Sequence, residues 1–192
     1  MYAFLLSTAV IFVAELGDKS QLMAMTFAAR YRLRDVLVGI TAATALVHLA
    51  SVALGAFVGD AFADYQGAIS VGAGVAFFAF AIWTVRGDSL TDDEADQAKN
   101  ASGAAVVAVG VAFFLAELGD KTMLATITLA TQEGWLGTWI GSTVGMVAAD
   151  ALAILAGALL GRTLPERAIT CGAGALFALF GLLLIAEGLG WI

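Results

Sequence analysis

Residues 14–20 of this chain are AELGDKS, and residues 116–122 are AELGDKT. Each string places three charged side chains inside a long apolar stretch. A charge near the centre of a bilayer is costly, so such a residue usually faces a cavity, a charged partner or a substrate. Because the same string occurs twice, 102 residues apart, the sequence indicates a duplicated binding site.

The composition is that of an integral membrane protein. Of the 192 residues, 61% are apolar and 13% are charged. A hydrocarbon core of about 30 Å is crossed by roughly 20 apolar residues, and a helix satisfies its own backbone hydrogen bonds there. We therefore predict an all-α membrane protein with six transmembrane helices, at residues 3–29, 36–59, 66–86, 103–130, 135–161 and 167–188.

The loop charges predict the orientation in the membrane. Outside the two motifs, lysine and arginine occur only in or beside three connections: Arg30, Arg32, Arg34, Arg86, Lys99, Arg162 and Arg167. The positive-inside rule puts these three loops in the cytoplasm and both termini outside it. The net charge of −7 comes chiefly from the third loop and argues against nucleic acid as a partner.

The duplication extends beyond the motifs. At the same offset Gly39 matches Gly141, and His48 matches Asp150. The repeat predicts two three-helix units, residues 1–86 and 103–192, joined by an acidic cytoplasmic linker at 87–102. Because each unit has an odd number of spans, the second enters the membrane from the opposite face. This inverted-topology repeat is an architecture that many secondary transporters use to build a site at the membrane midplane.

The motif carboxylates form the candidate cation site: Glu15, Asp18, Glu117 and Asp120. If the motifs are helical, the two acids of each motif are three residues apart and project from one face. A pseudo-twofold axis between the units then brings all four together. Lys19 and Lys121 balance two of the negative charges and leave −2, which suits one divalent cation or two protons.

Three polar residues assist the carboxylates as accessory groups: Ser20, Thr122 and Gln21. With backbone carbonyls they form an oxygen-rich site that favours Ca²⁺, Mg²⁺ or Mn²⁺ over thiophilic metals. Gly17 and Gly119 allow either local unwinding or close packing. The alternative is that Glu and Lys of each motif, four residues apart, form a self-contained bridge without a ligand. That arrangement leaves both aspartates without a partner.

Two further residues are candidates for a proton relay, because both are proton-capable and lie at matching mid-span positions. These are His48 and Asp150. For His48, a hydrogen-bonded residue between helices is an equal alternative. For Asp150 the functional interpretation is favoured, since a lone carboxylate in a span is costly.

The pattern Glu-x-Gly-Asp-(Lys/Arg)-(Ser/Thr), present twice in a six-span, two-repeat chain, resembles the Gdt-type cation exchanger family, the relatives of transmembrane protein 165. The resemblance covers essentially the whole chain. It implies export of Mn²⁺, or in some members Ca²⁺, from the cytosol in exchange for protons. It also implies that Glu15, Asp18, Glu117 and Asp120 are the cation ligands. The compact chain looks like a bacterial plasma-membrane version, with no cofactor other than the transported cation.

Three other functions remain open at this point. One is a lysine-exporter-like carrier of a small organic cation or amino acid, which the acidic midplane disfavours. Another is an intramembrane aspartyl enzyme using Asp18 and Asp120, although the adjacent lysines would keep both aspartates ionised. The last is a structural scaffold. The sequence predicts a transporter rather than an enzyme and leaves the oligomeric state open.

Overall fold

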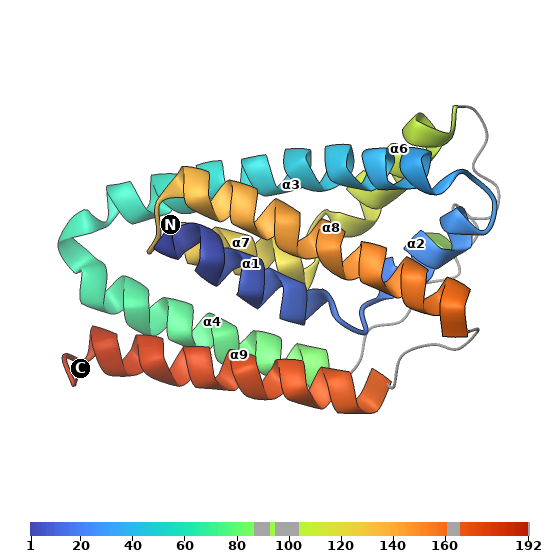
Figure 1. Cartoon of the computed structure of the whole chain (residues 1–192). Helices are drawn as coiled ribbons and strands as arrows, with labels where there is room; N and C mark the ends of the chain where they lie inside the picture. The colour runs from blue at the N-terminus through green and yellow to red at the C-terminus, as the bar shows by residue number, and fades with distance from the viewer. Residues whose placement is uncertain (87–92, 95–103, 161–165, 192) are drawn as a thin grey trace.

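The computed structural model describes residues 1–86, 93–94, 104–160 and 166–191, and in these residues it is helical throughout, with no strand (Figure 1). The helices of the first half are α1 (Tyr2–Glu15), α2 (Lys19–Ala28), α3 (Leu33–Ala61), the short 3₁₀ helix η1 (Ala63–Tyr65) and α4 (Gln66–Arg86). Those of the second half are α6 (Ala105–Glu117), α7 (Lys121–Ala130), α8 (Trp135–Leu160) and α9 (Glu166–Gly188). The all-helical prediction is confirmed. The predicted linker lies outside the described residues except for residues 93–94.

Four of the predicted spans are helices long and apolar enough to cross a membrane. They are Leu33–Ala61, Ala63–Arg86, Trp135–Ala158 and Thr170–Gly188. The predictions of single helices at 3–29 and 103–130 are wrong, because each of these stretches is two helices separated at the motif. The first helix of each pair, Tyr2–Glu15 or Ala105–Glu117, is apolar but only about 20 Å long, too short to span a bilayer alone.

The long helices pack crosswise between the two halves of the chain. Helix α3 lies against α6 and α7, and α8 lies against α1 and α2. Helices α4 and α9 run side by side along the bundle (Figure 1). Between α3 and α8, the Trp139 indole N–H donates to the Ala45 carbonyl at 2.8 Å. Each broken helix pair is therefore supported by a long helix from the other half.

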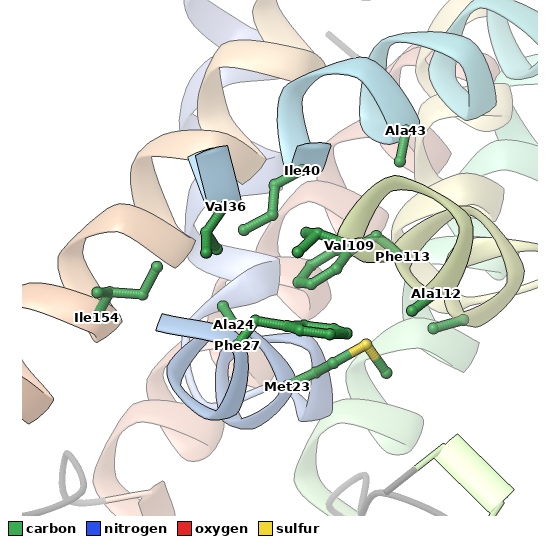
Figure 2. Close-up of a cluster of buried hydrophobic side chains, with 11 residues drawn as sticks. Met23, Ala24, Phe27, Val36, Ile40, Ala43, Val109, Ala112, Phe113 and Ile154 are labelled. Carbon is green, nitrogen blue, oxygen red and sulfur yellow. The ribbon is translucent and has the colours of Figure 1, made fainter. Parts of the chain in front are cut away.

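The apolar interior has two clusters, and both contain residues from the two halves. In the cluster shown in Figure 2, Phe27 of α2 packs with Phe113 of α6, their ring centroids 6.4 Å apart. In the other cluster, the ring centroids of Phe77 of α4 and Phe177 of α9 lie 5.7 Å apart. The chain ends lie at one end of the bundle and α2 at the opposite end (Figure 1). Each motif lies at the break between two short helices, α1 and α2 or α6 and α7.

Candidate cation site

Each motif forms a break of three residues between two helices. Helix α1 ends at Glu15, Leu16 is extended, and Gly17 has a φ of 78°. The second break repeats this geometry, with φ of 81° at Gly119. A positive φ of this size is strained for any residue with a Cβ, which explains the glycine in both motifs. Of the two alternatives for these glycines, local unwinding is the one observed, and the expectation of an uninterrupted helical face is wrong.

Each aspartate is the last residue of its break and is the N-cap of the next helix. Asp18 precedes α2, and Asp120 precedes α7. The Thr122 backbone N–H lies 3.4 Å from Asp120 Oδ2, the usual arrangement for a capping carboxylate. A helix N-terminus carries partial positive charge, which attracts a negatively charged side chain at the N-cap position.

The motif hydroxyls hold the glutamates. Thr122 Oγ1 donates to Glu117 Oε2 at 3.0 Å. In the other motif Ser20 Oγ donates to Glu15 Oε1 and lies 3.4 Å from Asp18 Oδ2. These hydrogen bonds orient the carboxylates across the breaks. Ser20 and Thr122 are therefore placed to position the glutamates, which is a more specific role than that of accessory oxygen ligands.

The lysines pair crosswise between the motifs. Lys121 forms an ion pair and hydrogen bond with Asp18. Lys19 Nζ lies 3.6 Å from Asp120 Oδ1 and 3.0 Å from Glu94 Oε1. The alternative of self-contained bridges left both aspartates without a partner. In the structure both aspartates have a lysine partner, and that lysine belongs to the other motif.

All four motif carboxylates are buried, each at most 3% exposed. Electrostatic interactions link Glu15 with Asp18, Glu117 and Asp150. One oxygen of Glu15 and one of Glu117 accept no hydrogen bond from the described residues. Yet no three His, Cys, Asp or Glu side chains of the described residues gather closely enough to hold a metal ion. In this arrangement the positive charges next to Asp18 and Asp120 are the ammonium groups of the motif lysines.

The two relay candidates differ in their surroundings. Asp150 is fully buried and interacts electrostatically with Asp18, Glu15 and Glu117. Neither of its oxygens accepts a hydrogen bond from the described part of the chain. His48 is also fully buried, and both its nitrogens lack a hydrogen-bond partner among the described residues. No carboxylate of that part of the chain has a resolved electrostatic interaction with it. The structure thus brings Asp150, and not His48, to the motif carboxylates.

Gln21 has a specific role that the sequence did not reveal. Its Oε1 accepts a hydrogen bond from the Gly17 N–H at 2.8 Å, and its Nε2 donates to the Ala149 carbonyl at 3.0 Å. It therefore ties the first break to α8 beside Asp150. In the second motif the equivalent position is Met123, whose Sδ lies 3.2 Å from the Gly119 N. In the sequence, the only sign of this role was that Gln21 and Met123 differ although they occupy matching positions after the two motifs.

Comparison with known proteins identifies the family of the chain. A family model described as "Divalent cation/proton antiporter GDT1" matches residues 3–92 and 105–191. A putative manganese exporter of Vibrio cholerae is 34% identical over 93% of this chain and 90% of its own length. The GDT1-like protein sll0615 of Synechocystis is 30% identical over 93% and 94%. The chloroplast protein PAM71 of Arabidopsis thaliana is 33% identical, but this chain spans only 56% of it. No solved structure matches the chain.

The matched model describes transporters, which makes the alternative of an intramembrane aspartyl enzyme wrong and confirms that the chain is not an enzyme. The resemblance drawn from the doubled motif is likewise confirmed. The substrates of such a protein are a divalent cation and protons, and its long apolar helices are those of a membrane protein. The chain belongs to the GDT1 family of divalent cation/proton antiporters.

Proposed function

We propose that this antiporter exports Mn²⁺ from the cytoplasm in exchange for protons, with Ca²⁺ as the alternative cation. The crosswise lysine–aspartate pairs carry the proposal, because they bring the charged groups of both motifs to one buried locus. We take Glu15, Asp18, Glu117 and Asp120 as the cation ligands. The choice of Mn²⁺ is supported by the relative named a putative manganese exporter.

In this proposal the cation enters by displacing ammonium groups. Lys121 on Asp18 and Lys19 on Asp120 neutralise the ligands when the metal is absent. A divalent ion competes with each ammonium for the same oxygens. Once a lysine moves aside, Asp18 and Asp120 can join the glutamates, each of which already has one oxygen that accepts no hydrogen bond from the described residues. Oxygen ligands of this kind suit a hard divalent cation.

Protons return through the same carboxylates. Ligands must be deprotonated to bind a metal, so protons and cation compete for one site. Asp150 is proposed as the proton relay because its carboxylate interacts with three motif acids. His48 remains a second relay candidate on its burial and its matching position alone.

Matching contacts support the inverted repeat. A Cβ on Gly39 would lie 2.9 Å from the Val106 carbonyl oxygen, and a Cβ on Gly141 would lie 2.4 Å from that of Phe4. Both pairs are related by the offset of 102 residues, so each long helix approaches the broken helix of the other half in the same way. We propose six crossings in two units, 1–86 and 103–192, with each broken helix pair counting as one crossing.

We propose the plasma membrane as the location, with both termini outside the cytoplasm. Cysteines introduced at Asp64 and at Asp93, in a Cys171→Ser background, test this orientation. A membrane-impermeant thiol reagent should label the first from outside and the second only after permeabilisation. Labelling of both positions from the same side would refute the inverted arrangement.

The function is tested in proteoliposomes with a proton gradient. Mn²⁺ flux should follow the gradient, and addition of Mn²⁺ to the detergent-solubilised protein should release protons. Ca²⁺, Mg²⁺ and lysine are offered in parallel, and lysine flux would favour the exporter of organic cations instead. Mn²⁺ flux that ignores the pH gradient across tight vesicles would leave a channel or uniporter.

A further inference from the structure

A carboxylate from outside both motifs contacts one of the two motif lysines. Glu94 Oε1 lies 3.0 Å from Lys19 Nζ, closer than Asp120 Oδ1 at 3.6 Å. The side chains of Lys19 and Glu94 are 14% and 16% exposed, whereas that of Asp120 is 1% exposed. Glu94 therefore reaches the edge of the buried site from the segment that joins the two halves.

The other lysine has a different environment. Lys121 is 3% exposed and pairs with the fully buried Asp18. The two motifs differ only at Ser20 and Thr122 and share their backbone geometry, so this difference in lysine contacts is not built into the motif itself. It comes from Glu94, which approaches Lys19 at the end of the bundle where α2 lies.

An ammonium shared by two carboxylates is bound less tightly by either one. The charge on Lys19 stabilises Asp120 as an anion, but it also competes with any metal for the Asp120 oxygens. Glu94 offers Lys19 a second partner in a less desolvated position, where the exchange of partners is easier. With Glu94 present, a metal entering at Asp120 displaces a lysine that already has another carboxylate to bind.

We propose that Glu94 is a positioning residue that draws Lys19 away from Asp120 and so raises the affinity of the site for its divalent cation. This inference rests on the proposed role of Asp120 as a cation ligand. It makes the joining segment part of the transport machinery through one ion pair. It also predicts that the two motifs differ in affinity although their sequences nearly coincide.

The test measures Mn²⁺ binding to the purified full-length protein by calorimetric titration. Glu94→Gln keeps the size of the side chain and removes its charge, so Lys19 should pair more closely with Asp120. The dissociation constant for Mn²⁺ should rise about two- to fivefold, the range expected for one partly exposed ion pair. In transport assays the concentration of Mn²⁺ at half-maximal flux should rise by the same factor.

Two controls separate this effect from a general loss of negative charge. Asp93→Asn removes the neighbouring exposed charge and should leave the dissociation constant unchanged. In a Lys19→Met background, Glu94→Gln should cause no further shift, because the residue through which it acts is gone. Binding remains measurable in this background even if transport is lost.

Three results would overturn the proposal: an unchanged dissociation constant in Glu94→Gln, an equal shift in Asp93→Asn, or a shift that persists without Lys19. Each of these leaves the wild-type binding of Mn²⁺ intact. Failure of the proposed function is distinguishable, since the wild-type protein itself would then bind no Mn²⁺.

Discussion

The ion pair between Asp18 and Lys121 should contribute both to stability and to transport, and a double-mutant cycle can separate the two. Both side chains are buried, at most 3% exposed. Asp18→Asn leaves a buried ammonium without its main counter-ion, and Lys121→Met leaves a buried carboxylate. Removing one partner of a buried pair typically costs about 3–5 kcal/mol, whereas removing both is often close to neutral.

The measurement is thermal unfolding in detergent, followed by the fluorescence of the four tryptophans. Each single variant should lower the midpoint by on the order of 10 °C, by the usual conversion for chains of this size. The double variant Asp18→Asn/Lys121→Met should recover most of that loss, because neither charge is left alone. Its Mn²⁺ transport should nevertheless remain absent, since a ligand is missing.

Two outcomes would refute this reasoning. If the double variant is destabilised by the sum of the two single effects, the pair does not couple in the folded protein. If the double variant transports Mn²⁺ at the wild-type rate, Asp18 is not a ligand and the shared-site proposal fails.

Two further predictions concern residues other than the four motif carboxylates. Gln21→Met should keep a partner for the Gly17 N–H, as Met123 provides for Gly119 in the other motif, but it should lose the hydrogen bond to the Ala149 carbonyl. The pH profile of transport should therefore shift in Gln21→Met and stay unchanged in the control Met123→Gln. At the far end of the bundle, partial burial and then the nearby Glu187 raise the pKa of Glu133. A carboxyl whose folded pKa is raised favours folding as the pH falls, so the gain in thermal stability between pH 7 and pH 5 should be smaller in Glu133→Gln.

The sequence predicted the long helices well because their apolar length is a strong signal. The expected span 66–86 coincides with α4, and 36–59 falls within α3. The broken helices were harder, since Glu-Leu-Gly-Asp is compatible with a helix containing a glycine. The signal for a second helix start was an aspartate in the N-cap position, Asp18 in one motif and Asp120 in the other. The charge of these aspartates was interpreted as that of cation ligands instead.

The four motif carboxylates could be proposed as a cation site from the sequence, but their pairing with the lysines could not be predicted. Repetition singled out the four motif carboxylates as candidates, because a charge that recurs inside two apolar stretches is informative without any coordinates. Asp150 became a candidate as a lone carboxylate in a span, at the position that matches His48. Which lysine meets which aspartate depends on how the two halves dock, and only the tertiary structure contains this information. The contact of Glu94 with Lys19 is likewise invisible in the sequence, where Glu94 is one of several acids in a linker.

The crosswise packing of α3 and α8 has a consequence for the origin of such chains. Phe27 of the first half and Phe113 of the second lie in one apolar cluster, so neither half encloses an interior by itself. A polypeptide of one half alone would leave that cluster open and would have to bind a second copy of itself. Two such copies would each contribute one seven-residue motif. Joining the two halves in one chain supplies each half with its complement and allows matched positions such as Gln21 and Met123 to carry different residues.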